Sequence, residues 1–227
     1  MRWDTILWSN SRQILSSISL LSSSLSLLSS LCTDSSTVTA ISYSQRIANN
    51  DQEFIPRLKN HLLAHYDDIP FDRVDPIFSD EEQDSIKFVG DCIYTHQVFC
   101  INYTTYNLRR AQDSINIHNH PYVMTLGHED EDNGIKSHLY WYAKVLRIFH
   151  VNVRHSGHME TEHMDFLWVH WFRYDLDHKG GFSTRQLHCI GLTDSKDFTS
   201  YRFLNPSDVL QAVYLIPAFK FSPNQTI

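Results

Sequence analysis

Two runs of alternating apolar and polar residues stand out in the second half of the chain. Leu139–His150 (LYWYAKVLRIFH) and Met164–Tyr174 (MDFLWVHWFRY) are rich in β-branched and aromatic residues that recur with a period of two. That period places successive side chains on opposite faces of a strand. Thirteen mostly polar residues lie between the two runs. The pattern predicts two long strands joined by a long, histidine-rich loop, as in a small β-barrel.

Two further segments predict strands of the same sheet system. Gln97–Arg109 alternates in the same way over its whole length. Near the end, Gln211–Ala218 is a short β-prone segment that stops at a proline. It follows Asn205–Asp208 (NPSD), where asparagine suits a helix N-cap and proline the first helical position. The C-terminal part of the chain is therefore expected to be mainly β.

Helical patterns come before these strands. Asp51–Tyr66 predicts a helix because apolar side chains recur at four-residue spacing, at Phe54, Leu58, Leu62 and Tyr66. Ser79 and Glu82 have the spacing of a capping box. A short second helix is therefore predicted to run to about Val89, with Gly90 as its stop.

These elements divide the chain into four parts. Residues 1–50 are predicted to be a disordered low-complexity tail, because 1–45 contain fifteen serines and eight leucines. Residues 51–91 form a helical lead-in, 92–221 the β domain, and 222–227 a short C-terminal tail. The longest apolar run in the tail is three residues, whereas a membrane-spanning helix needs about 20. We therefore expect no membrane segment and a mainly β, α+β fold.

The cysteines and charges narrow the setting. Cys32, Cys92, Cys100 and Cys189 form no CxxC pair and match no disulfide framework, which predicts reduced thiols in an intracellular protein. The formal charge is −7, and the excess of acidic residues lies in 46–138, with sixteen acidic and eight basic side chains. Proteins that bind nucleic acid through phosphates usually show an excess of Lys and Arg. The charge distribution therefore argues against direct phosphate contact with nucleic acid.

Three segments of the β region carry a family resemblance. Tyr142–Phe149 (YAKVLRIF), Leu167–Arg173 (LWVHWFR) and Leu204–Ile216 (LNPSDVLQAVYLI) resemble, in order and spacing, the core strands and closing segment of bromo-adjacent homology (BAH) domains. The resemblance implies a BAH-like or SH3-like partly open β-barrel. It also implies recognition of a protein or peptide partner, such as a histone tail, in the nucleus.

A second resemblance covers roughly residues 54–221. Asn102–Asn116 (NYTTYNLRRAQDSIN) and Tyr214–Phe219 (YLIPAF) are similar to segments of uncharacterised proteins of mushroom-forming fungi. Those proteins multiply with transposons of the Plavaka and Kyakuja–Dileera–Zisupton type. The resemblance implies a mobile-element context and carries no established activity with it.

Aromatic residues on the two long strands are the first candidates for a binding site. Tyr140, Tyr142 and Trp168 have the side chains that form a cage around a methylated lysine, through cation–π attraction. Alternating aromatics on adjacent strands also fill the interior of small barrels. Packing in the core is therefore the commoner role for such residues, and the cage is the alternative.

Two polar groups are weaker candidates. Arg109, Arg110 and Asp113 follow one another closely and suit a carboxylate or phosphate contact, although an internal salt bridge is the commoner role. His155, His158 and His163 lie in the expected loop and are possible zinc ligands, although solvated histidine-rich loops more often bind no metal.

No catalytic motif is recognisable in the sequence. It contains no nucleophile elbow, phosphate-binding glycine loop, HExxH motif or Rossmann fingerprint, and only seven glycines. We therefore expect a non-enzymatic protein-recognition module without a cofactor. The alternatives are a truncated structural or accessory remnant of a transposon-encoded protein and a nucleic-acid-binding accessory module.

Overall fold

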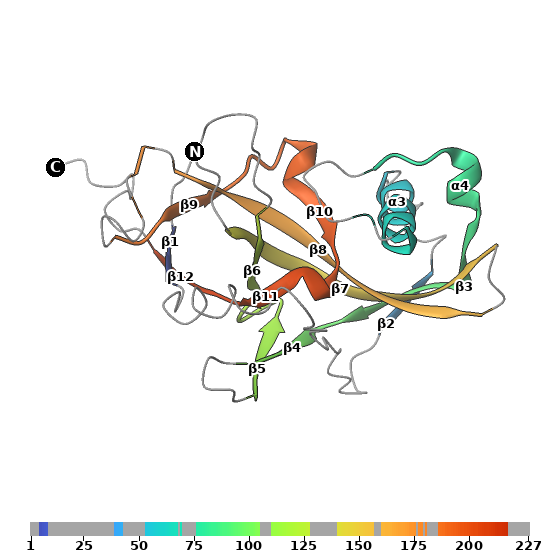
Figure 1. The fold of residues 1–227 in the computed structure, drawn as a ribbon, viewed down its shortest axis with the longest axis horizontal. Coiled ribbons are helices and arrows are strands. Elements are labelled where there is room, and N and C mark those ends of the chain that lie inside the picture. Colours follow the sequence, from blue (N-terminus) through green and yellow to red (C-terminus); the bar gives the residue numbers. More distant parts are fainter. Residues whose placement is uncertain are drawn as a thin grey trace.

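The fold is known from a computed structural model of the 227-residue chain (Figure 1). It describes residues 5–8, 39–42, 53–67, 69, 76–104, 110–127, 140–156, 160–175, 177–178, 180 and 186–217. Of residues 5–8, 39–42, 103–104, 110 and 198 it describes the backbone alone. No helix among the described residues is long and apolar enough to cross a membrane.

Two long antiparallel strands, β7 (Tyr140–His155) and β8 (Glu162–Tyr174), form the centre of the main sheet. Along one edge, β7 pairs first with β6 (Tyr122–Leu126) and then with β3 (Ile86–His96). Bulges interrupt the register in β3, in β7 and in β11. Strands that bend at bulges and exchange neighbours produce a curved sheet. The predicted fold class, mainly β with a partly open barrel-like sheet, is confirmed.

The remaining strands extend this sheet on both sides. Next to β6 lies β11 (Val209–Ala212), and next to β3 lies β2 (Thr39–Ser42). On the other side, β8 pairs with β10 (Tyr201–Leu204) and β9 (Cys189–Leu192), and β9 continues through β1 (Thr5–Trp8) to β12 (Tyr214–Pro217). A separate hairpin consists of β4 (Val98–Thr104) and β5 (Arg110–Asn116). Two 3-10 turns, Phe198–Ser200 and Pro206–Asp208, complete the C-terminal part.

The long loop predicted between the two central strands is wrong. Strand β7 continues to His155 and β8 begins at Glu162, so most of the thirteen residues are paired. Val151 and Val153 are fully buried on the face of the sheet that carries helix α3 (Phe54–Tyr66). Their alternation continues the strand pattern, and burial of these side chains outweighs the turn tendency of the polar residues between them.

The two helices lie together at one end of the sheet, at the right in Figure 1. Helix α3 (Phe54–Tyr66) confirms the first predicted helix. Helix α4 (Asp80–Asp84) begins with the predicted capping box but ends five residues before Val89. The chain changes to strand there because Ile86 and Phe88 pair with the end of β7. Gly90, with φ +71°, lies in the resulting bulge and does not end a helix.

Two segments of the expected N-terminal tail are strands. Thr5–Trp8 pairs with β9 and β12, and Thr39–Ser42 pairs with β3. Both segments are rich in β-branched or aromatic residues, which favour strands when a sheet edge is open to pairing. The rest of residues 1–52, and the C-terminal tail from 218, lie outside the described residues. The expected boundary at residue 92 also falls inside β3, so the helices belong to the same folded unit as the barrel.

The sheet buries a core on each face. On one face, the helix-side core joins α3 residues such as Leu58 to sheet residues such as Phe149. On the other, the hairpin-side core joins Phe99 of β4 to Ile148 of β7. A third group, the end core, contains Met124, Tyr142, Ile190 and Val213. Because Ile148 and Phe149 are successive residues of one strand, β7 contributes to both faces.

One cysteine differs from the expectation of reduced thiols. Cys92 and Cys189 are free, but Cys100, on β4 and buried, is disulfide-bonded. Stable disulfides are most frequent in proteins of oxidising compartments. The wide sequence spacing of the cysteines gave no sign of this bond, because folding brings distant cysteines together.

Candidate functional site

The aromatic candidates Tyr140 and Tyr142 belong to the end core. Tyr142 is 5% exposed, and its ring lies 5.9 Å from that of Tyr174. The Tyr174 hydroxyl donates a hydrogen bond to the Tyr140 carbonyl oxygen at 2.9 Å. Burial raises the pKa of Tyr142 to about 12. Both tyrosines therefore support packing at one end of the sheet.

The third aromatic candidate, Trp168, lies elsewhere. Its ring packs against Phe203 and Phe54 in the helix-side core, with centroid distances of 4.6 and 5.8 Å. The guanidinium of Arg57 lies over it, 5.3 Å from the ring centre. Ala143, the residue after Tyr142, pairs with Trp171 on β8. Trp171 is three residues from Trp168, or about 10 Å along the strand, so Trp168 lies well away from the position opposite Tyr142. Trp168 thus does not converge with the two tyrosines, and the predicted three-residue cage is wrong.

The polar candidates do not form one described group. Arg109 lies outside the described residues, and only the backbone of Arg110 is described, at the start of β5. Asp113 Oδ2 accepts a hydrogen bond from the backbone N–H of Ala212 at 3.0 Å. That bond ties the β4–β5 hairpin to β11. The hydrogen bond of Asp113 is therefore an internal link to backbone, and not the internal salt bridge or solvated strand end that the sequence favoured.

The candidate zinc ligands are also separated. His155 lies at the end of β7 with its ring 5.3 Å from Tyr66, and His158 lies outside the described residues. His163 lies on β8 opposite Asn152. Since residues 152 and 155 are an odd number apart on one strand, their side chains point to opposite faces. His155 and His163 therefore do not share a site.

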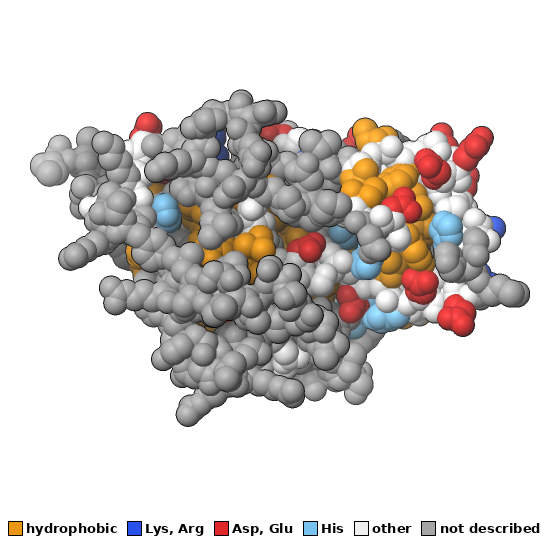
Figure 2. Space-filling view, in the orientation of Figure 1, with side chains coloured by type: hydrophobic (Ala, Val, Ile, Leu, Met, Phe, Trp, Pro, Cys, Tyr) orange, Lys and Arg blue, Asp and Glu red, His pale blue; other side chains and the backbone are white. Residues whose placement is uncertain are grey.

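His163 instead belongs to a group that the sequence did not predict. We call His96, His150, His163 and Asp165 the histidine cluster. It lies across β3, β7 and β8, on the face opposite α3, where His150 and Asp165 are directly paired. The His96 Nε2 and His150 Nδ1 atoms are 2.5 Å apart, and His163 Nε2 is 3.0 Å from Asp165 Oδ1. In Figure 2, histidine side chains are visible over the right half of the molecule, where these strands cross.

Neighbouring groups orient the rings of the histidine cluster. Tyr94 stacks on His150 with ring centres 4.5 Å apart and an interplanar angle of 11°. The Nδ1 atom of His163 lies 3.3 Å from Asn152 Oδ1. Burial and the nearby imidazoles lower the pKa of His150 to about 4. His150 is therefore neutral at physiological pH, and its Nδ1 atom shares a hydrogen bond with His96 Nε2.

A second feature, which we call the acidic groove, lies between α3 and α4. It is a cavity of about 520 Å³ lined by Leu63, Asp67, Phe78, Ser79, Glu81, Glu82, Ser85 and His155. The carboxylates of Asp67, Glu81 and Glu82 are exposed, while Leu63 and Phe78 form an apolar floor. None of these lining residues is a lysine or an arginine. The groove therefore has a negative rim and an apolar base.

Local folding fixes the wall of the groove. Ser79 is the N-cap of α4, and Glu82 accepts hydrogen bonds from the Ser79 N–H and hydroxyl at 2.8 Å each. These bonds lower the pKa of Glu82, which therefore stays ionised. Two large apolar side chains near the groove in sequence, Ile69 and Ile77, are 42% and 90% exposed. Figure 2 shows acidic side chains around an apolar patch at this end, over α3 and α4.

Sequence reasoning missed both features for identifiable reasons. His163 and Asp165 alternate on one strand, a sign that they share a face, but that stretch was expected to be partly loop. His96 and His150 join them only through strand pairing across 54 residues of sequence. The groove depends on how α3 packs beside α4. No protein family, no curated protein and no solved structure matches the chain.

Proposed function

We propose that this domain is a non-enzymatic protein-recognition module that binds a lysine- or arginine-rich peptide segment in the acidic groove. The observation that carries the proposal is the groove itself, with three carboxylates, an apolar floor and neither lysine nor arginine in its lining. A protein of net charge −7 attracts a cationic peptide and repels polyanions. Histone tails are peptides of this class, and one of them serves as the model ligand in the test below.

The groove suits the two parts of a lysine side chain. The aliphatic stem packs on Phe78 and Leu63 while the ammonium group reaches the rim. Glu81 is the best-placed rim residue to supply attraction, because Glu82 already accepts the hydrogen bonds of the capping box. Ion pairs at an exposed rim are weak individually, each about 0–1 kcal/mol. Binding therefore requires several such contacts and weakens as salt increases.

This mode of recognition makes a prediction about methylation. Because Tyr140, Tyr142 and Trp168 form no common cage, the proposal needs no quaternary ammonium. We expect unmodified and trimethylated forms of one lysine peptide to bind with affinities within about threefold, since methylation keeps the charge. Acetylation removes the charge and is expected to weaken binding.

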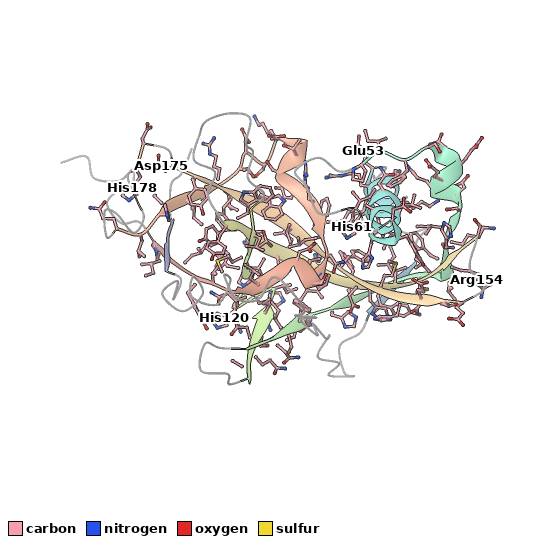
Figure 3. The ribbon with its side chains drawn as sticks, viewed as in Figure 1. Glu53, His61, His120, Arg154, Asp175 and His178 are labelled. Atoms are coloured by element: carbon pink, nitrogen blue, oxygen red, sulfur yellow. The ribbon has the colours of Figure 1, made fainter. Side chains whose placement is uncertain are left out.

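The test is a binding titration with fluorescently labelled peptides. The probes are a lysine-rich peptide of histone-tail composition and a matched peptide with glutamine at each lysine. Glu81→Lys is expected to weaken binding of the lysine peptide by about fivefold or more. The matched control is Asp177→Lys, an equal change of charge between Asp175 and His178, at the other end of the molecule (Figure 3). It is expected to leave binding nearly unchanged.

Two outcomes would contradict the proposal. If the lysine and glutamine peptides bind equally well, charge does not drive recognition. If no peptide binds at any salt concentration, an accessory remnant without its own partner is the better description. The redox state of Cys100 distinguishes two settings, because a nuclear protein is expected to keep this thiol reduced, whereas the disulfide seen in the structure is typical of an oxidising compartment.

A further inference from the structure

The histidine cluster has the donor atoms of a transition-metal site. His150, His163 and Asp165 each place one ligand atom within 4.8 Å of the others. Among the described residues, they are the group of three potential metal ligands that lie this close together. Metal ligands at about 2.0–2.2 Å in a tetrahedral site are about 3.3–3.6 Å from one another. Donor atoms within 4.8 Å therefore need to approach by at most about 1.5 Å, which side-chain rotations can supply. Two imidazoles and a carboxylate are a donor set that suits zinc.

The backbone holds these donors in place. His150 and Asp165 are cross-strand partners, and His163 is opposite Asn152, the next position on the same face of β7. Neighbouring antiparallel strands fix such side chains about 4.5–5.5 Å apart at Cβ. The donors are thus part of the central strand pair, unlike the exposed loop residues that the sequence suggested.

The surrounding groups complete the arrangement of a metal site. If His163 Nδ1–H donates to Asn152 Oδ1, its Nε2 atom faces Asp165 Oδ1 with a lone pair. In that tautomer Nε2 and Asp165 Oδ1 present two lone pairs to a cation between them, whereas without a cation Nε2–H can donate to Asp165 Oδ1. His96 shares a hydrogen bond with one ring nitrogen of His150 and positions that ring. Partners of this kind orient metal-binding histidines in known sites.

Exposure gives an ion a route into the site. The side chain of His163 is 53% exposed and that of Asp165 is 26% exposed, while the other side of the cluster is closed by the sheet. With three protein ligands, one tetrahedral position is left for water. We propose that His150, His163 and Asp165 bind one zinc ion, with His96 and Asn152 as positioning residues. This site is independent of the acidic groove and of peptide binding.

The direct test measures zinc bound by the full chain. After equilibrium dialysis against zinc and removal of free metal, elemental analysis is expected to give about one zinc per chain. His163→Ala and Asp165→Asn are each expected to lower zinc affinity by about tenfold or more. His120→Ala is the matched control, because His120 lies away from the cluster, beside Tyr214 (Figure 3). It is expected to retain full binding.

A second measurement keeps the result interpretable if a variant is destabilised. Cobalt added to the metal-free protein is expected to give the visible absorption of a tetrahedral site, and zinc is expected to displace it. His163→Ala, which changes an exposed side chain, is expected to fold normally by circular dichroism and to lose this absorption. Zinc content near zero in the unmodified chain, or equal binding by His163→Ala and His120→Ala, would overturn the proposal.

Discussion

Replacement of Leu58 by alanine tests whether α3 belongs to the folding unit of the barrel. Leu58 is fully buried and packs in the helix-side core, whose sheet residues include Phe149 and Phe166. The change removes three carbon groups, worth about 0.8 kcal/mol each when buried, or about 2.4 kcal/mol before any cavity remains. The cavity adds to this cost, and measured Leu→Ala changes in cores lie at about 2–5 kcal/mol. We expect a loss of about 3 kcal/mol in the free energy of unfolding.

The assay is urea unfolding followed by tryptophan fluorescence, with the slope of the transition compared between variants. Ile77→Ala is the control, because a side chain that is 90% exposed contributes little to the free energy of unfolding. A loss below about 1 kcal/mol for Leu58→Ala, or a separate early transition, would refute the reasoning. The helix would then be only loosely docked, and the barrel would fold without it.

Four further changes test other parts of the structure. Burial and the nearby His65 lower the pKa of His61, on α3 (Figure 3), to about 4. Below pH 6.5 His61 gains a proton in the unfolded chain but stays neutral in the folded state. The contribution of His61 to the free energy of unfolding is therefore complete above pH 6.5. This contribution is lost as the pH falls from about 6.5 to 4, at up to about 1.4 kcal/mol per pH unit. His61→Gln is therefore expected to reduce the difference in the free energy of unfolding between about pH 7 and pH 5, measured by urea titration. Asp113→Ala removes the bond to Ala212 and is expected to cost about 1.5 kcal/mol in the same assay. Gly90→Ala is expected to cost about 1 kcal/mol from its positive φ alone, since nothing lies within 4 Å of the added Cβ. Thiol alkylation of the unfolded, unreduced chain is expected to leave Cys100 unlabelled until a reductant is added.

Three of these predictions have an outcome that would contradict them directly. An unchanged pH profile for His61→Gln would mean that another group controls acid unfolding. Full stability of Asp113→Ala would show that the hairpin is held by its apolar contacts alone. Immediate labelling of Cys100 would show a reduced thiol, as a nuclear setting requires, and would contradict the disulfide.

Local patterns predicted the elements that depend on neighbouring residues. The four-residue spacing of α3, the capping box at Ser79 and the N-cap at Asn205 all form as expected. Their geometry is decided within one or two turns of chain. The apolar alternation in β7 and β8 also predicted the central strands, although the end of β7 was placed too early and the start of β8 too late. Strand ends depend on which partner is available, which local sequence does not state.

The aromatic strands also show where pattern fails as a guide to function. Tyr142 and Trp168 look alike in the sequence, as aromatic residues on neighbouring strands. In the structure they pack in two different cores, one in the end core and the other beside α3. A shared site requires the right distance along the strands as well as the right face. Register sets that distance, and a bulge between Val145 and Arg147 alters it.

The sequence by itself determined the mainly β character of this protein, its helical N-terminal part and its excess of negative charge, because these depend on composition and short-range periodicity. Only the tertiary structure decided where the chemistry lies. The histidine cluster brings His96 on β3 to residues of β7 and β8, and the acidic groove exists because α3 packs beside α4. Both depend on contacts between segments that are distant in the sequence. The free energy that stabilises these contacts comes from burying apolar side chains on the two faces of the sheet.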